Sequence, residues 1–176
     1  MPQPEFSAFS NVIAGYRSIA GQLPEKLLIS NGPKGLSTWY APFEHINVRA
    51  KFVICGITPG WQQADKALCA ARDALRAHKS EKEALEIAKN TGSFAGVMRT
   101  NLVKMLDHIG ANHYLRLSSS AELFGTRKDL VHYTSALRYP VFKNGENYSG
   151  SSVDLHLKLT QDLHLILTHP GRQIMA

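Results

Sequence analysis

The chain has 176 residues, of which 44% are apolar and 19% charged, as expected for one globular domain that buries most of its apolar surface. Its net charge of +6 and pI of about 9.4 favour an anionic partner, nucleic acid first, although a soluble protein can be basic without binding one. No stretch approaches the roughly 18 apolar residues of a membrane span, and residues 1–10 lack the pattern of a signal peptide.

The cysteine content argues against a disulfide framework or a zinc site. Only Cys55 and Cys69 are present, and we expect both to be reduced, which fits a cytoplasmic protein. We therefore predict no metal and no cofactor.

The N-terminal third shows one weak helical pattern and one aromatic segment. Residues 6–23 have apolar side chains near helical spacing, and Pro24 interrupts them. Residues 31–35 are rich in Gly and Pro, which predicts a loop. Residues 36–48 form an irregular segment with three aromatic side chains, which either line a pocket or cover the core.

The next segment predicts a buried strand followed by a sharp loop. Residues 52–55 (FVIC) are a continuous apolar run, typical of a central strand covered on both faces. The loop Gly56–Gly60 (GITPG) has little side-chain bulk at its two glycines, so a ligand could approach its backbone closely. Such a loop at the carboxyl end of a parallel strand is where open α/β sheets place ligands.

Three helices and a second strand are predicted after this loop. We expect helices over residues 62–78, 81–90 and 95–109. Ser80 and Glu83 form a capping box for the second helix, and Gly110 ends the third. Residues 121–124 fit one helical turn, residues 130–134 a second strand, and Asn144-Gly145 a tight turn.

The C-terminal segment differs from the rest of the chain. Its leucines alternate over residues 153–168, which is strand periodicity. We interpret residues 1–176 as one domain with an atypical segment at 151–176 that is shortened or altered.

Residues 52–64 (FVICGITPGWQQA) resemble the first active-site motif of the uracil-DNA glycosylase superfamily, above all its mismatch-specific uracil/thymine-DNA glycosylase branch. Residues 93–96 (SFAG) are similar to a segment whose Phe stacks on the base in that superfamily. Residues 131–140 occupy the place of a strand that ends in Thr-Asn. The resemblance implies a three-layer α/β/α sandwich with a mostly parallel central sheet.

The sequence also departs from the family pattern. Thr58 stands where the family has Asn or an acid at or beside this position, and a threonine hydroxyl does not ionise at neutral pH. Ser135 replaces an Asn that reads the uracil edge in one branch. His169-Pro170 is a poor counterpart of the family's last motif, and the cysteine ligands of an iron–sulfur cluster are absent.

The resemblance assigns roles to particular residues. Thr58 and His169 are the catalytic candidates, and Thr58 equally fits a structural role in the turn. Candidates for phosphate contacts are Arg99, Lys104, Arg138 and Lys143, although single surface charges are more often only solvated. The substrate-binding candidates are Gly56, Ile57, Pro59, Gly60, Trp61, Phe94, Ser135 and Asn147.

Several of these assignments have simpler readings. Phe94 and Trp61 could be packing aromatics, and Asn147 could be present for its turn. His132 is expected to be a core or edge histidine of its strand. His156, His164 and His169 are not joined by a carboxylate or thiolate at ligand spacing, so we expect no metal there. The carboxylates to examine near Thr58 are Asp65, Glu146 and Asp154.

The expected function is hydrolysis of the N-glycosidic bond of a damaged base, uracil first, flipped out of single- or double-stranded DNA by a monomer. A non-catalytic nucleic-acid or nucleotide binder of the same fold is the alternative. A nucleotide-processing α/β enzyme outside the superfamily is a third reading, based on fold analogy alone.

Overall fold

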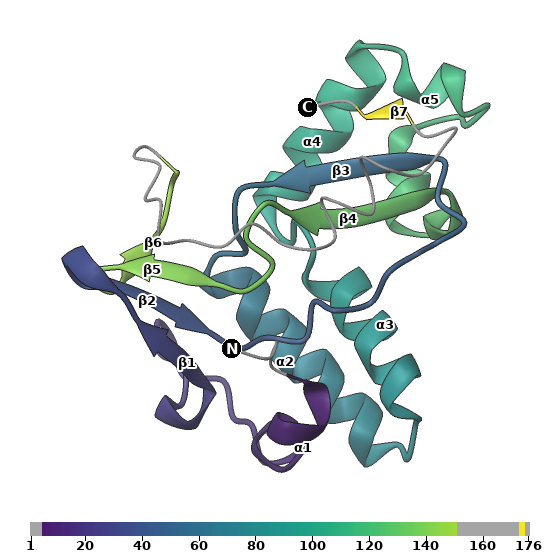
Figure 1. Cartoon of the computed structure of the whole chain (residues 1–176). Helices are drawn as coiled ribbons and strands as arrows, with labels where there is room; N and C mark the ends of the chain where they lie inside the picture. The colour runs from purple at the N-terminus through teal and green to yellow at the C-terminus, as the bar shows by residue number, and fades with distance from the viewer. Residues whose placement is uncertain (1–4, 151–172, 175–176) are drawn as a thin grey trace.

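The structure is a computed structural model that describes residues 5–150 and 173–174 of the chain. Its strands form two separate sheets (Figure 1). The helices are α1 (Phe6–Ala14), α2 (Trp61–Arg76), α3 (Glu81–Gly92), α4 (Val97–His108) and α5 (Ala111–Tyr114). The strands are β1 (Leu28–Asn31), β2 (Leu36–Trp39), β3 (Phe52–Gly56), β4 (Val131–Ser135), β5 (Val141–Lys143), β6 (Glu146–Asn147) and β7 (Gln173–Ile174).

One sheet is antiparallel and the other is parallel. The antiparallel sheet has the order β1-β2-β5-β6, and the parallel sheet has the order β4-β3-β7. In the parallel sheet, β3 pairs with β4 over its whole length, from Phe52 opposite Val131 to Gly56 opposite Ser135. The short β7 pairs with the start of β3 on its other side.

The expected three-layer sandwich with a mostly parallel central sheet is therefore wrong. The lengths of the connections explain the difference, because parallel pairing needs a crossover of a dozen or more residues. The connection between β3 and β4 is such a crossover and contains α2 to α5, so these two strands pair in parallel. The links β1–β2 and β5–β6 are short, so these strands pair antiparallel.

The helical predictions are confirmed in outline. The segments expected at 62–78, 81–90 and 95–109 are α2, α3 and α4, and Ser80 caps α3 through the predicted box with Glu83. Gly110 follows α4 with a left-handed φ of 78°. The N-terminal helix is shorter than expected and ends at Ala14.

The first core lies between α1, α2 and α3, with Tyr40 and Phe43 packed against them. The buried alanines of α2 and α3 bring these two helices close together. Gly92 shows how close they are, since a Cβ there would lie 2.8 Å from the Cβ of Ala67. A larger residue at position 92 would therefore push α3 away from α2.

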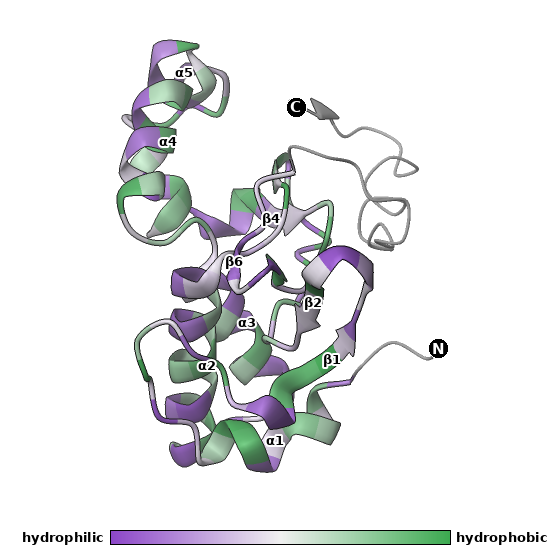
Figure 2. Cartoon of the chain, turned by 90° about the vertical axis from the view of Figure 1, so that its left-hand side faces the viewer, coloured by the Kyte–Doolittle hydropathy of each residue, from purple (hydrophilic) through white to green (hydrophobic). Residues whose placement is uncertain are grey.

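The second core lies on the other side of the parallel pair. Phe52 and Ile54 of β3 alternate onto the same face and pack with Tyr133 of β4 and Leu106 of α4. Figures 1 and 2 show α4 and α5 at the far end of the molecule from α1. The parallel strands thus separate two helical groups.

The turn at Asn144-Gly145 is confirmed as the two-residue loop of a hairpin between β5 and β6. Both residues have positive φ, 53° and 82°, as the favoured hairpin turns require. The aromatic segment 36–48 was expected to be irregular, but its first four residues form β2. The prediction of strand periodicity at 153–168 lies outside the described residues.

A pocket at the carboxyl ends of the two parallel strands

The loops that follow β3 and β4 are hydrogen-bonded to one another. The N–H of Ala136 donates to the carbonyl of Gly56 (2.8 Å), and the N–H of Leu137 donates to that of Ile57 (2.9 Å). These bonds extend the parallel pairing beyond Gly56 and Ser135. The carboxyl ends of both strands therefore meet at one edge, which is where a ligand site is expected from the sequence.

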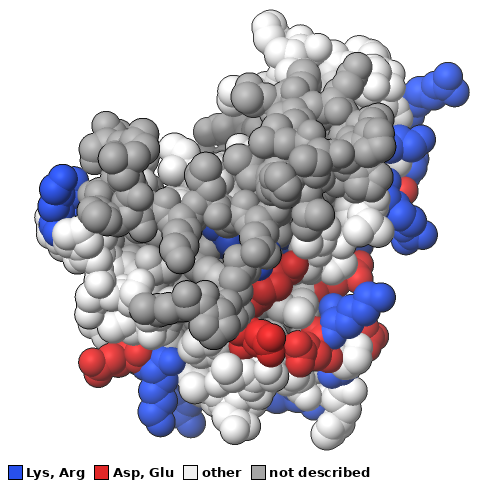
Figure 3. Space-filling model, in the orientation of Figure 1, with Lys and Arg blue, Asp and Glu red and all other residues white. Residues whose placement is uncertain are grey.

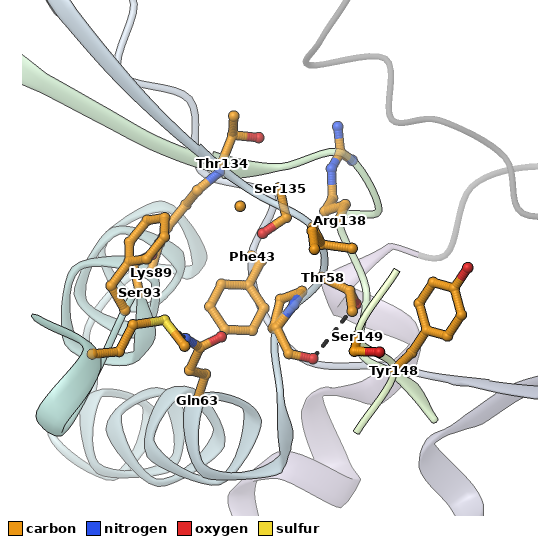
Figure 4. Close-up of a pocket in the computed structure, with 15 residues that line it drawn as sticks. Phe43, Thr58, Gln63, Lys89, Ser93, Thr134, Ser135, Arg138, Tyr148 and Ser149 are labelled. Carbon is orange, nitrogen blue, oxygen red and sulfur yellow. Dashed lines mark hydrogen bonds between the residues drawn. The ribbon is translucent and has the colours of Figure 1, made fainter. Parts of the chain in front are cut away.

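A pocket of about 360 Å³ opens at this edge. Its volume lies within the range of roughly 300–1,000 Å³ that is typical of small-molecule sites. Its walls come from elements far apart in the chain: the loop after β3, the end of β4, α3, and the segment after β6. Figure 4 shows Lys89 and Ser93 on one side of the pocket and Tyr148 and Ser149 on the other. We call it the strand-end pocket. Its lining residues include the predicted Gly56, Ile57, Thr58, Pro59, Phe94, Ser135 and Arg138.

The Thr58 side chain ties the two sheets together. Its hydroxyl donates to the carbonyl of Tyr139 (2.9 Å) and accepts the N–H of Val141 (3.1 Å), the first residue of β5. Both partners are backbone groups, so Thr58 fixes the loop after β4 against the loop after β3. This geometry supports the structural reading of Thr58, with the side chain still at the pocket wall.

Gly60, Trp61 and Asn147 meet at the N-terminus of α2 outside the strand-end pocket. The Oδ1 of Asn147 accepts the N–H of Trp61 (2.8 Å) and so satisfies one of the free donors at the helix start. A Cβ at Gly60 would lie 3.1 Å from that Oδ1, so the glycine permits the contact. Asn147 therefore fixes the β5–β6 hairpin to α2.

Phe94 has an unusual backbone conformation for an aromatic residue. Its φ is 52°, in the left-handed region that costs an L-residue about 1–2 kcal/mol. A Cβ at Gly56 would lie 3.4 Å from its ring, so the ring stands beside the loop after β3. The ring also meets the edge of Tyr133, whose own ring stacks on Phe124.

Arg99 holds the segment that carries Phe94. One of its terminal nitrogens, Nη2, donates to three backbone carbonyls, including that of Ser93 at 2.7 Å. Its guanidinium also lies over the ring of Phe124, 4.9 Å from the centroid, and burial lowers its pKa. Arg99 was expected at the DNA backbone, but in this structure it is half-buried and acts on the protein itself.

The sequence interpretation missed Lys89. This lysine lies on α3 and is only 3% exposed, which is rare for a lysine. It lines the strand-end pocket and also a second cavity, bounded by His45 and His132, on the other side. A signal was present, since Lys89 follows Leu85 by four residues on the apolar side of the helix. Gln63, Met98 and Thr134 are further lining residues that were not predicted.

No carboxylate or imidazole lines the strand-end pocket among the described residues. Asp65 accepts a hydrogen bond from Tyr16 (2.7 Å), and Glu146 is exposed on β6. Glu44 is the carboxylate linked to the site, because Tyr139 donates to it through its hydroxyl (3.3 Å). Burial raises the pKa of Glu44.

The remaining candidates are not gathered at the pocket. Lys104 is exposed on α4, Lys143 is half-buried on β5, and neither lines it. His169 and Asp154 lie outside the described residues. Within the described ranges, no three His, Cys, Asp or Glu side chains are grouped so as to hold a metal ion, and no helix is long and apolar enough to span a membrane.

Comparison with known proteins gives one relative and no function. The chain is similar to uncharacterized protein YoxB of Bacillus subtilis (strain 168), with 40% identity over 117 residues. The match covers 65% of this chain and 45% of the relative, so the chain spans less than half of that protein. No family model matches the chain, and no solved structure matches it.

Proposed function

We propose that the strand-end pocket receives a single base turned out of DNA, and that the protein hydrolyses the N-glycosidic bond of that nucleotide. Uracil is the first candidate base, as the sequence resemblance implies. The free thiols of Cys55 and Cys69 fit the cytoplasm. We expect a monomer.

The observation that carries this proposal is the placement of Phe94. Its ring stands at the pocket wall beside Gly56, backed by Tyr133, although its backbone conformation is unfavourable for an aromatic residue. Stacking of a base on an aromatic ring contributes about 1–3 kcal/mol in other systems. A ring held in this way offers a firm stacking surface.

Polar groups around the pocket suit the edge of a base and its departure. Gln63 and Ser135 can exchange hydrogen bonds with a base edge. Arg138 brings positive charge to the wall, which would favour a base that leaves as an anion, and the buried Lys89 adds a hydrogen-bond donor there. Where described residues are visible in Figure 3, Lys and Arg side chains are scattered and lie beside a group of Asp and Glu side chains. The support for the proposal therefore comes from the pocket and not from a broad basic surface.

A specific observation favours a second candidate, a binder without hydrolytic activity. The described lining residues provide no general base for water, and the Thr58 hydroxyl is engaged by backbone groups. A base could then be held without being released. The two candidates share the pocket and differ in the chemistry.

The test is a glycosylase assay on labelled oligonucleotides that carry uracil, hypoxanthine, xanthine or a G:T mismatch, in single and double strands. Strand cleavage after alkali shows base release. Phe94→Ala should lower kcat/KM by about 5- to 150-fold, which corresponds to 1–3 kcal/mol of lost stacking.

The matched control is Phe9→Leu, because Phe9 stacks on Tyr40 in the first core and does not line the pocket. It should leave the rate unchanged. Binding by fluorescence anisotropy without base release would favour the second candidate. Neither binding nor release, in a folded chain, would refute both.

A further inference from the structure

Gln63 caps the start of α2 and also lines the strand-end pocket. It is the third residue of the helix, and its Oε1 accepts the N–H of Gly60, the residue before the helix (3.1 Å). A glutamine at this position that reaches back in this way satisfies one of the free donors at a helix start. Figure 4 shows its side chain extending from α2 toward Phe43. The helix cap therefore holds the Gln63 amide in one place at the pocket.

The contact with Gly60 also fixes which end of the amide is left for a ligand. A backbone N–H can only donate, so the atom of Gln63 beside it must be the amide oxygen. The amide nitrogen Nε2 then lies on the other side, 3.4 Å from the thioether sulfur of Met98, which is a weak acceptor. This contact is exposed, and Met98 also lines the pocket. Because an amide nitrogen carries two hydrogens, Nε2 keeps one to donate to a ligand.

The other polar groups of the pocket leave this donor unopposed by a fixed acceptor. The carbonyls of Gly56 and Ile57 each accept an N–H from the loop after β4, and the Thr58 hydroxyl binds two backbone groups. Arg138 can only donate, whereas the serine hydroxyls of the lining can rotate to donate or to accept. No carboxylate is present among the described lining residues. The groups with a fixed direction therefore favour a ligand edge that accepts.

We propose that Gln63 is a specificity-determining residue, which selects bases that carry a carbonyl oxygen where cytosine and adenine carry an amino group. Nε2 of Gln63 donates to that oxygen in uracil or hypoxanthine. The amino group of cytosine or adenine is itself a donor, so it would face Nε2 with no hydrogen bond between them, which disfavours the complex.

The chemical class of the substrate follows from this choice. Deamination of cytosine at C4 or of adenine at C6 replaces the amino group by an oxygen, so the selected bases are the deaminated ones. Gln63 would thus separate a damaged base from its normal parent by the direction of one hydrogen bond. The inference rests on the proposed function, because a base meets Gln63 only when it occupies the strand-end pocket.

The experiment measures binding of labelled single-stranded oligonucleotides that differ only in the central base. Uracil is compared with cytosine and hypoxanthine with adenine, and an abasic site reports binding of the backbone alone. Single strands have no base pair to open, so the differences reflect the pocket. Fluorescence anisotropy, read before base release, should show 5- to 150-fold tighter binding of the oxygen-bearing base in each pair, which corresponds to about 1–3 kcal/mol for one polar group without a partner.

The variant Gln63→Glu replaces the donor by an acceptor and keeps the cap. Glutamate also occurs at this position of a capping box, so one carboxylate oxygen can still accept the N–H of Gly60, and a negative charge is favourable at a helix start. The variant should therefore prefer cytosine and adenine. The matched control is Gln62→Glu, which adds the same charge at an exposed neighbour that does not line the pocket. It should keep the preference of the unmodified chain.

The outcomes separate this inference from the hydrolytic activity, which strand cleavage after alkali reports on the same samples. If Gln63→Glu keeps the base preference of the unmodified chain, the inference is wrong, even if uracil is released normally. A preference that reverses in this variant without any base release would support the inference and refute the hydrolysis. Equal affinity of the unmodified chain for every oligonucleotide, the abasic one included, would refute base binding in the strand-end pocket and this inference with it.

Discussion

The two sheets of this protein differ in how they are built and in what they contribute to the site. The parallel pair β3–β4 is buried between helical groups. β3 is an apolar run up to Cys55, whereas β4 alternates apolar and polar residues. The antiparallel sheet consists of two hairpins, β1–β2 and β5–β6, with strands of two to four residues, and β2 pairs with β5 to join them. The strand-end pocket belongs to neither sheet alone. Its floor comes from the parallel pair, and one wall follows β6 of the antiparallel sheet.

The largest expected effect is on the free energy of unfolding, when one isoleucine in each sheet is truncated to alanine and the two losses are compared. Ile54 of β3 is 7% exposed and packs in the second core, so Ile54→Ala should lower the free energy of unfolding by about 2–5 kcal/mol. Ile29 of β1 is only partly buried, and Ile29→Ala should cost clearly less. Urea unfolding measures both. Equal losses of unfolding free energy in the two variants would show that the two sheets contribute equally to stability.

The next effect concerns the contact between the sheets. Thr58→Val removes the hydroxyl that joins Tyr139 and Val141, leaving two backbone groups without this partner. The loss in unfolding free energy should be about 1–3 kcal/mol. Thr58→Ser is the matched control, since it keeps the hydroxyl. If the Thr58→Val and Thr58→Ser variants have the same stability, the hydroxyl of Thr58 does not couple the two sheets.

A smaller effect is expected where the hairpin contacts α2. Asn147→Ala removes the acceptor for the N–H of Trp61 and should cost about 0.5–2 kcal/mol, as loss of a helix cap does. Asn147→Asp keeps an acceptor and places a negative charge at the helix N-terminus, which is favourable by about 0.3–1 kcal/mol. In thermal unfolding at neutral pH, the Asn147→Asp variant should therefore have a higher Tm than the Asn147→Ala variant. The reverse order would argue against capping.

The smallest effect is a change in pH dependence. Burial raises the pKa of Glu44 above its ordinary value of 4.5, so the folded protein holds this proton more tightly than the unfolded chain. The stabilisation is complete below the unfolded pKa and is lost as pH rises through the folded pKa. Glu44→Gln should therefore be more stable than the original chain at neutral pH, with the difference vanishing in acid. Denaturant unfolding between pH 4 and 8 tests the sign, and a variant that is less stable at neutral pH would contradict it.

Much of the parallel region could be predicted from the sequence, and the antiparallel sheet could not. The run FVIC and the loop GITPG predicted β3 and the loop that follows it, since both signals are local. Strands as short as Val141–Lys143 show little periodicity, and only the Asn144-Gly145 turn indicated a hairpin. The pairing of β2 with β5 joins segments about 100 residues apart, and nothing local in the sequence specifies it.

The site was predictable where it depends on one loop and not where distant segments meet. Gly56, Pro59, Phe94 and Ser135 were expected at the ligand edge and line the pocket. Trp61 was expected there too, but α2 begins at this residue and its side chain lines a separate cavity beside Trp39. The roles of Arg99 and Lys89 depend on packing around α3 that helical spacing alone does not reveal.

The left-handed conformation of Phe94 has a consequence for how this position should vary among relatives. At a φ of 52°, glycine or asparagine would relieve backbone strain of about 1–2 kcal/mol. The ring that would be lost packs against the second core, and truncation of a packed phenylalanine costs about 3–5 kcal/mol. Replacement of Phe94 should therefore lower stability although it relieves strain, so an aromatic residue should be retained at this position in relatives that keep the second core, whether or not they bind a base.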